Sequence, residues 1–181
     1  MLVRTETFEL KANQTISKKI TLRTIDLSKV DHPKVTFKNV VTTSDKQFLN
    51  LNNHGGDKGM ILLFVDPAKE PTRHVLNDLK LLKEDFNYWG GEIVLVVPQS
   101  LLTPAFAFDI TGLPNKTTYV VDYKNELLNT MKTTFHLDED FPITMLINSK
   151  KELLFQALGY RIGIGETLLK NIQMDANSCK K

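Results

Sequence analysis

The sequence predicts a mixed α/β fold that carries a β-rich extension at its N-terminus. Before residue 55, apolar and polar residues alternate and Val, Ile, Thr and Phe are frequent, which is typical of half-buried strands. After residue 55, continuous apolar runs alternate with stretches of helical periodicity. This change divides the chain into an extension or small antiparallel domain, residues 1–55, and an α/β domain, residues 56–181.

The extension is expected to contain three strands, at residues 5–10, 15–25 and 34–43. The segments KANQ and LSKVDHP, which carry turn-type residues, separate them. Three short strands without a helix bury little core. We therefore expect the extension to pack on the α/β domain or on sequence upstream of it.

The α/β domain begins with a strand–helix–strand unit. MILLFV at 60–65 is a continuous apolar run, as expected for a strand that is buried on both faces of a sheet. A helix is expected from about Pro71 to Trp89, because one face carries the apolar stripe Val75, Leu79, Leu82 and Phe86. The glycine pair at 90–91 ends this helix. EIVLVVP at 92–98 is then a second buried strand, parallel to the first through a right-handed crossover.

The remaining elements complete a mixed sheet with helices on both faces. Residues 100–110 are expected to be helical in part, 117–123 to form a third strand and 125–135 to form a helix. A hairpin follows at 141–160, in which SKKE joins the strands ITMLIN and LLFQAL, and residues 164–174 form a closing helix. The order from residue 60 is therefore β-α-β-α-β-α-β-β-α.

Composition excludes several classes of function. The 23 basic and 21 acidic residues nearly balance, and no concentrated basic patch stands out, so nucleic acid is not an expected partner. The longest apolar run is about six residues, against the ~20 that cross a bilayer, so direct membrane insertion is not expected. MLVRTETF does not read as a signal peptide. The chain is thus either cytoplasmic or part of a longer precursor.

Four local sequences, in this order, resemble a thioredoxin-like fold over roughly residues 47–174. QFLNLNNHGGDKGMILLFV resembles the loop and first central strand of secreted thiol reductases, and FVDPAKEPT aligns without a gap on the family pattern F-W-A-x-W-C-G-P-C. FPIT at 141–144 resembles the cis-proline tripeptide, and ALGYRIGIGETLLKNI resembles the turn into the last helix. The resemblance implies a thioredoxin-like mixed central sheet and a cis peptide bond before Pro142.

The same alignment implies that the reactive dithiol is missing. Lys69 and Thr72 occupy the two cysteine positions, and Pro71 matches the family's proline. In the family, the first cysteine is a thiolate at a helix N-terminus. A lysine there has no redox chemistry and a threonine cannot resolve a disulfide. The resemblance therefore implies no catalytic residue at this position, and no cofactor is expected.

A narrower resemblance concerns the surroundings of the domain. The combination of DPAKEPTRHVLNDL, WGG, LPN, DFPI and GYRIGIGETLLK is similar to the C-terminal region of secreted transglutaminase-like proteins of Bacteroidetes. In those chains a β-rich linker precedes a thioredoxin-like domain that often lacks cysteines. This implies a periplasmic or cell-surface location as part of a longer precursor. The implied partner is a neighbouring domain of that precursor, or an unidentified protein or peptide.

A candidate binding groove lies between the Pro71 turn and the Pro142 loop. It comprises Asp66, Glu70, Pro71, Arg73, His74, Phe141 and Pro142. Asp66 or Thr72 can cap the helix that starts here, and Arg73 with His74 could line a small anion-binding spot. The simpler interpretation is structural for the acidic residues and a solvated surface for Arg73 and His74.

No metal site is expected, because the four histidines, His32, His54, His74 and His136, are scattered along the chain. The acidic triplet at 138–140 reads as a solvated loop. Cys179 is the single cysteine, lies in a polar tail, and cannot form an intramolecular disulfide. It reads as an incidental exposed thiol.

Three hypotheses about function remain open. The first is a non-catalytic, redox-inactive accessory or interaction module of a larger secreted protein. The second is a thiol-dependent oxidoreductase or peroxidase that uses Cys179 or a partner's cysteine. The third is a binder of small molecules or peptides in the groove near Pro71 and Pro142.

Overall fold

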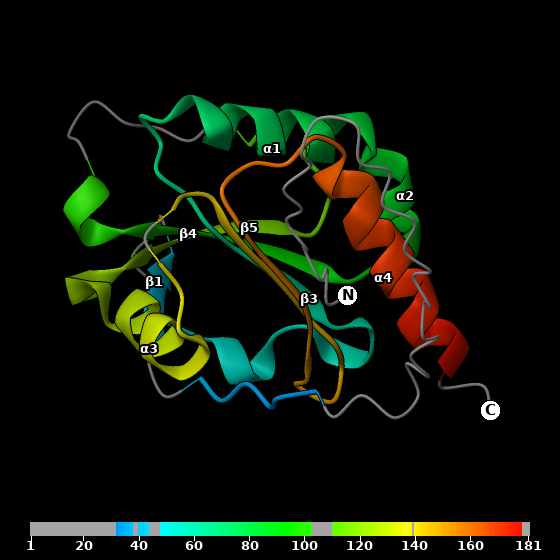
Figure 1. Cartoon of the computed structure of the whole chain (residues 1–181), viewed down its shortest axis with the longest axis horizontal. Helices are drawn as coiled ribbons and strands as arrows, with labels where there is room; N and C mark the ends of the chain where they lie inside the picture. The colour runs from blue at the N-terminus through cyan, green and yellow to red at the C-terminus, as the bar shows by residue number, and fades with distance from the viewer. Residues whose placement is uncertain (1–31, 38–39, 44–47, 103–109, 139, 179–181) are drawn as a thin grey trace, which may run out of the picture. The chain divides into compact units, whose positions relative to one another are not determined.

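Continuous apolar runs form the centre of a seven-stranded mixed sheet (Figure 1). The computed structural model describes residues 32–37, 40–43, 48–102, 110–138 and 140–178, all of which belong to one compact unit, residues 31–181. The strand order is β2-β1-β5-β4-β3-β6-β7. The strands are β1 Val40–Thr43, β2 Phe48–Asn50, β3 Met60–Phe64, β4 Glu92–Pro98, β5 Thr117–Asp122, β6 Ile143–Ile147 and β7 Leu153–Leu158.

The pairing of the central strands confirms the predicted parallel unit and the predicted hairpin. β3 runs parallel to β4, and β4 runs parallel to β5. β6 pairs antiparallel with both β3 and β7. Leu62 of β3 therefore lies between Val94 and Met145 in the ladder. This arrangement has the parallel half and the hairpin half that the order of elements predicted.

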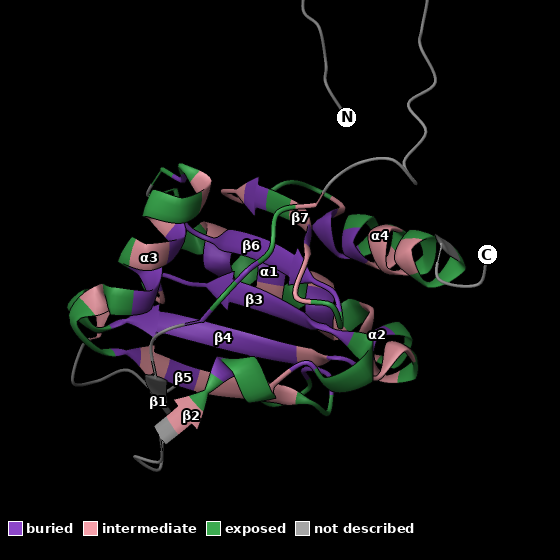
Figure 2. Ribbon diagram, turned by 90° about the horizontal axis from the view of Figure 1, so that it is seen from below, coloured by how far each residue is buried: buried purple, intermediate pink, exposed green. Residues whose placement is uncertain are grey.

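Helices cover both faces of the sheet. They are α1 Glu70–Leu81, α2 Lys83–Trp89, α3 Glu126–Phe135 and α4 Ile164–Ser178. Successive side chains of a strand point to opposite faces, so Leu62 and Phe64 pack with Met131 of α3, while Ile61 and Leu63 pack toward α1, α2 and α4. The central strands are consequently buried on both sides (Figure 2).

The sequence predicted one helix over residues 71–89, but the structure has two, α1 and α2. The prediction of a single continuous helix was therefore wrong. Leu82 lies between α1 and α2 with φ −102° and ψ 23°. At this point α4 approaches closely: a Cβ on Gly165 would lie 2.7 Å from Leu82 Cδ1. The apolar stripe runs through the break to buried Phe86, so the sequence pattern carries no mark of it. Gly90 ends α2 in the left-handed conformation, as predicted.

The described part of the N-terminal region adds strands to the sheet. β1 pairs antiparallel with β5 and with β2, whereas the sequence predicted no strand at β2. Of the strand expected at 34–43, β1 is formed and Lys34 makes an isolated bridge with Glu152. The strands expected at 5–10 and 15–25, and most of the helix expected at 100–110, lie outside the described residues. The domain division at residue 55 stays a prediction.

No described helix combines the length and the apolar composition that crossing a membrane requires.

Candidate functional site

The turn between β3 and α1 is built around Asp66. The residue is only 8% exposed, and its Oδ1 accepts a hydrogen bond from the Ala68 N–H at 3.0 Å. Its backbone carbonyl accepts from the Lys69 N–H at 3.1 Å. A side-chain oxygen that binds the backbone two residues on is a turn-forming device. Asp66 therefore stabilises the turn that connects the buried strand β3 to α1.

Lys69 stands at the start of α1 as its N-cap residue, in an extended conformation, and Pro71 lies in the first turn. The Lys69 Nζ lies 4.0 Å from Asp66 Oδ2 and 5.6 Å from the centroid of the Phe141 ring. An ammonium group over an aromatic face is attracted by the ring quadrupole. The side chain thus spans a carboxylate of the β3–α1 turn and an aromatic ring of the loop before β6.

Thr72 does not cap the helix, so this part of the prediction was wrong. The residue is 1% exposed, and its Oγ1 has no hydrogen-bond partner. Its backbone N–H donates to the Lys69 carbonyl at 3.2 Å instead. Thr144 of β6 is equally buried and also lacks a partner for its hydroxyl. Asp66 binds a residue before the helix, so its role is in the turn rather than at the cap.

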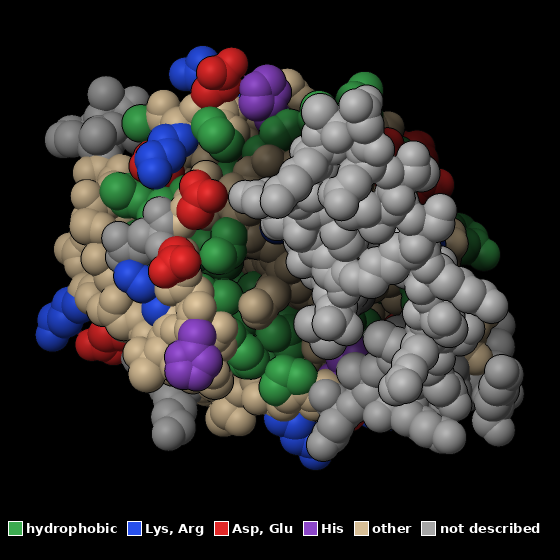
Figure 3. All heavy atoms as spheres, in the orientation of Figure 1, with side chains coloured by type: hydrophobic (Ala, Val, Ile, Leu, Met, Phe, Trp, Pro, Cys, Tyr) green, Lys and Arg blue, Asp and Glu red, His purple; other side chains and the backbone are tan. Residues whose placement is uncertain are grey.

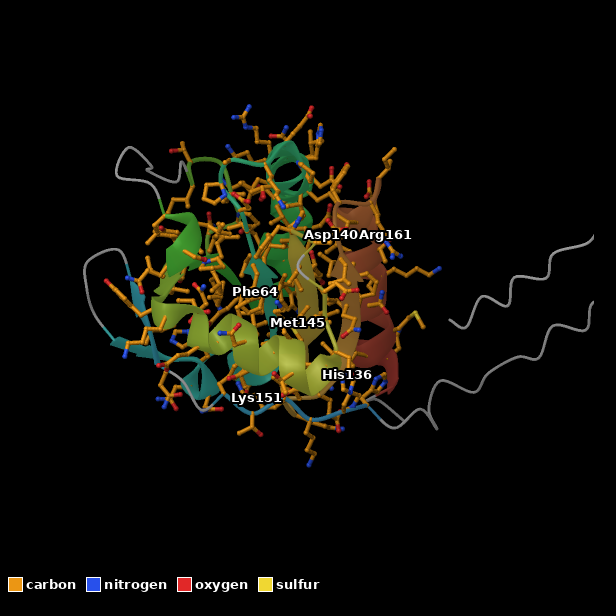
Figure 4. All side chains as sticks on the ribbon, turned by 60° about the vertical axis from the view of Figure 1, so that its left-hand side comes forward. Phe64, His136, Asp140, Met145, Lys151 and Arg161 are labelled. Atoms are coloured by element: carbon orange, nitrogen blue, oxygen red, sulfur yellow. The ribbon has the colours of Figure 1, made fainter. Side chains whose placement is uncertain are left out.

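The loop before β6 contains the predicted cis peptide bond, between Phe141 and Pro142. Both residues are buried, with Phe141 6% exposed. The loop is tied to the end of β7, because the Gly159 N–H donates to the Asp140 carbonyl at 2.9 Å. Figure 4 shows Asp140 and Arg161 toward the same end of the molecule, and Lys151 toward the other.

The exposed residues of α1's first turns form a second group. The His74 Nε2 lies 3.5 Å from Glu70 Oε1, and its ring stacks on Tyr160 at 5.1 Å between centroids. The Tyr160 hydroxyl lies 3.3 Å from Asp78 Oδ1. Partial burial, together with the Asp78 carboxylate, raises the pKa of Tyr160. His74 is thus engaged within the chain, and the anion-binding spot that Arg73 and His74 were expected to line stays a prediction.

The structure therefore brings together only part of the predicted groove. Asp66 and Phe141 meet through Lys69, and His74 meets Glu70. Arg73 is exposed on α1. Sequence reasoning missed Tyr160, whose contact with Asp78 joins residues 82 positions apart. Binding at this end of the molecule stays a prediction.

A third cluster, also missed, lies at the opposite ends of β3 and β4. The His54 Nδ1 lies 2.6 Å from Glu92 Oε2, and the Lys151 Nζ donates to the His54 backbone carbonyl. Burial lowers the pKa of Lys151, and the Glu92 carboxylate opposes that shift. These contacts connect the loop before β3, the start of β4 and the β6–β7 turn. Their effect is to fix three segments that are distant in sequence.

Asp122 is a buried carboxylate with a helix-capping role. It is 1% exposed at the end of β5, and its two oxygens accept from the Leu127 and Leu128 N–H groups at 2.9 and 2.8 Å. Negative charge is favourable at the N-terminus of a helix. Burial nevertheless raises the pKa of Asp122, because it outweighs the opposing effect of those N–H groups. Within the described residues, no cluster of three or more His, Cys, Asp and Glu side chains is placed to hold a metal.

The chain was compared with known proteins. No protein-family model and no curated protein sequence matches it. Among solved structures, it is similar to a protein described as a thiol:disulfide interchange protein DsbE from Chlorobium tepidum, with 17% identity and a TM-score of 0.62, over 81% of this chain and 98% of that one. It is similar to peroxiredoxin Q from Xanthomonas campestris, with 16% identity and a TM-score of 0.56, over 82% and 98%.

A third similar structure is the pneumococcal exposed lipoprotein thioredoxin Etrx1 from Streptococcus pneumoniae, with 15% identity and a TM-score of 0.53, over 75% of this chain and 98% of that one. Identities at this level show the fold alone. The chain has a thioredoxin-like mixed α/β fold, as the sequence predicted.

Proposed function

We propose that this chain is a non-catalytic, redox-inactive module of a larger secreted protein, and that it docks a neighbouring domain of the same precursor or another protein or peptide. One observation carries the proposal. Where the resemblance places the first cysteine of a reactive pair, the Lys69 ammonium lies between the Asp66 carboxylate and the Phe141 ring. We take this position to carry a partly exposed cation in place of a nucleophile.

The chemistry of the neighbouring position supports the same conclusion. Dithiol exchange needs one thiolate that attacks and a second sulfur that resolves the mixed disulfide. Thr72 is buried and carries a hydroxyl, and the sequence contains one cysteine, Cys179, which is 107 residues further along. The proposal therefore assigns the β3–α1 turn to folding rather than to electron transfer.

The proposed docking rests on the exposed residues of α1, and the proposed location rests on resemblances to other proteins. The first turns of α1 present Lys69, Glu70, Arg73 and His74 on the surface, which is a mixed-charge surface of the kind found at the rim of protein interfaces. The resemblance to secreted transglutaminase-like proteins supports an extracytoplasmic location, and so does the fold similarity to an exposed lipoprotein thioredoxin. Fractionation of the source cells, followed by immunoblotting, tests the location; recovery in the cytoplasmic fraction would overturn it.

A second candidate is a thiol-dependent oxidoreductase or peroxidase that acts through Cys179 or through a partner's cysteine. The fold similarity to a thiol:disulfide interchange protein and to a peroxiredoxin favours it. The two candidates differ in a turbidity assay of insulin reduction by dithiothreitol and in an assay of peroxide consumption. We expect the purified chain to leave both rates at their background values. An acceleration that disappears in Cys179→Ser would establish the second candidate instead.

A further inference from the structure

Asp66 is a nearly buried carboxylate with one oxygen that is not hydrogen-bonded by the described residues. Its side chain is 12% exposed, and its Oδ1 accepts the Ala68 N–H at 3.0 Å. The Lys69 Nζ lies 4.0 Å from its Oδ2, which is beyond hydrogen-bonding distance. The described side-chain oxygens that are fully buried without a partner are those of Thr72 and Thr144, so Asp66 Oδ2 keeps access to solvent. A carboxylate so far removed from water favours a further donor at that oxygen.

An aromatic ring lies beside the same oxygen. The Lys69 Nζ is 5.6 Å from the centroid of the Phe141 ring, so one ammonium group is shared between the carboxylate and the ring. Ring faces attract cations. Phe141 is 6% exposed, whereas the Lys69 side chain is 48% exposed. Asp66 Oδ2 and the Phe141 ring therefore form a cation site, which the chain fills with its own half-exposed lysine.

The cation site lies away from the place where the described N-terminal segment meets the sheet. That segment bonds to the start of β7, where the Leu153 N–H donates to the Pro33 carbonyl. The loop that carries Phe141 bonds beyond the end of β7, where the Gly159 N–H donates to the Asp140 carbonyl. β7 has six residues at about 3.3 Å each, so roughly 20 Å separate the two places. Side chains of both charges gather over the start of α1, so the surroundings of the cation site are polar (Figure 3).

We propose that the cation site binds the guanidinium group of an arginine on the partner that this module docks, with Lys69 moving aside into solvent. The chain's own lysine, seated there, already shows that the site accepts a cationic side chain. Lys69 leaves the hydrogen-bonding capacity of Asp66 Oδ2 unused. A guanidinium supplies it, because its planar fork donates to a carboxylate while its flat face stacks on an aromatic ring. The inference rests on the proposed docking function and names the chemical group that is recognised.

Two other kinds of ligand suit the cation site less well. An anion is attracted by the N-terminus of α1 and by Lys69, but the Asp66 carboxylate lies beside both and repels it. A metal ion takes several carboxylate, imidazole or thiolate ligands. No group of three or more such side chains is placed to hold one in the part of the chain that the structure describes. An arginine needs one carboxylate and one ring, and the cation site provides both.

The test measures binding of Nα-acetyl-arginine methylamide to the full chain by ¹H–¹⁵N NMR titration. Nα-acetyl-citrulline methylamide has nearly the same shape without the charge and is the matched control ligand. The proteins are the wild type, Lys69→Met, which removes the competing cation, and Lys170→Met, which makes the same change at an exposed position of α4. Lys69→Gln repeats the removal with a second neutral residue. Asp66→Asn, added to Lys69→Met, removes the carboxylate and keeps an oxygen for the Ala68 N–H. Thermal unfolding establishes that the variants are folded.

We expect the arginine probe to bind Lys69→Met with a dissociation constant on the order of 10 mM and to shift the amide signals of residues 66–70 and 140–142. The wild type and Lys170→Met should bind at least about threefold more weakly, because Lys69 competes for the site. The citrulline probe should not bind, and the added Asp66→Asn change should abolish binding. Equal affinity of the wild type and Lys69→Met, equal binding of the two probes, or signal shifts in another region would each overturn the proposal.

This experiment is independent of redox chemistry, so its failure differs from a failure of the proposed function. If the arginine probe does not bind and insulin reduction stays at its background rate, the cation site is wrong and the redox-inactive module stands. If the probe binds and the wild type accelerates insulin reduction, the cation site stands and the proposed function is wrong.

Discussion

The Lys69 ammonium and the Asp66 carboxylate lie 4.0 Å apart at the point where the buried strand β3 gives way to helix α1. The two residues of this pair differ in burial and in their other contacts. Asp66 is nearly buried and also holds the Ala68 N–H, whereas the Lys69 side chain is 48% exposed. Asp66 therefore contributes to the turn in its own right, and Lys69 contributes through a partly screened contact.

Because Asp66 is more buried and makes more contacts than Lys69, replacing each residue should lower stability by a different amount. Asp66→Ala should lower the free energy of unfolding by about 1–2 kcal/mol, because a part-buried N–H loses its acceptor. Lys69→Ala should lower it by less than about 1 kcal/mol, as for other exposed ion pairs. Urea unfolding measures both, with Lys170→Ala on the exposed side of α4 as the control. A larger loss for Lys69→Ala than for Asp66→Ala would contradict this view of the turn.

The buried threonines should tolerate loss of their hydroxyls. Thr72 Oγ1 and Thr144 Oγ1 lack partners, and an unpaired buried hydroxyl costs free energy. Thr72→Val and Thr144→Val should therefore leave the free energy of unfolding unchanged, or raise it by about 1 kcal/mol.

Thr117→Val is the matched control for this prediction. The Thr117 hydroxyl donates to the Pro114 carbonyl at 2.7 Å, so its removal should cost about 1 kcal/mol in the same urea titration. A loss above about 1 kcal/mol in either of the first two variants would mean that the hydroxyl is satisfied, for instance by a buried water.

Asp122 predicts a specific dependence of stability on pH. Because burial raises its pKa in the folded chain, the folded state takes up this proton at a higher pH than the unfolded state does. Where the folded state binds more protons, the free energy of unfolding rises as the pH falls. The difference in stability between wild type and Asp122→Asn should therefore grow in favour of the wild type between neutral pH and about pH 4.

Urea unfolding of the two proteins at a series of pH values checks this sign. A difference that shrinks as the pH falls would show that the N–H groups of Leu127 and Leu128 outweigh burial. A separate variant, Asp122→Ala, should cost about 0.5–2 kcal/mol at neutral pH, because it removes both bonds at the start of α3.

Gly59 should be among the least replaceable residues of the sheet's rim. It has a φ of +82°, and an added Cβ would lie 2.3 Å from the Ile147 carbonyl oxygen, which belongs to the backbone of β6. Gly59→Ala should lower the free energy of unfolding by roughly 2–4 kcal/mol. Gly56 has a φ of +40° and open space around it, so Gly56→Ala should cost only about 1 kcal/mol. Equal losses in thermal unfolding would show that β6 moves to make room.

The strands at the centre of the sheet were predictable because burial on both faces removes polar residues from them. MILLF, EIVLVVP and ITMLI have the length and the β-branched, apolar composition of strands buried between helices. The cis bond at Pro142 followed from the resemblance of FPIT to a family motif. The break at Leu82 was not predictable, because the apolar stripe continues through it and the close neighbour of Leu82 in α4, Gly165, is 83 residues away.

The same distinction applies to the candidate site: contacts between residues close in sequence could be predicted, and contacts between distant residues could not. The turn residues Asp66 and Lys69 are close in sequence, so their proximity could be expected. The contact of Lys69 with Phe141, the stacking of His74 on Tyr160 and the pairing of His54 with Glu92 each join distant parts of the chain. A periodic pattern describes one element at a time, so it contains no information about such pairs.

We proposed that the chain is redox-inactive because the β3–α1 turn carries Lys69 and Thr72 at the positions that the resemblance assigns to two cysteines. Insulin reduction by dithiothreitol tests it most directly, with the wild type, Lys69→Cys, Thr72→Cys and the double variant Lys69→Cys/Thr72→Cys measured side by side. We expect the wild type and both single variants to match dithiothreitol alone. The double variant should accelerate the reaction, because a thiolate at residue 69 would lie at the start of a helix. An active wild type, or a folded double variant that forms the disulfide and stays inactive, would contradict the claim.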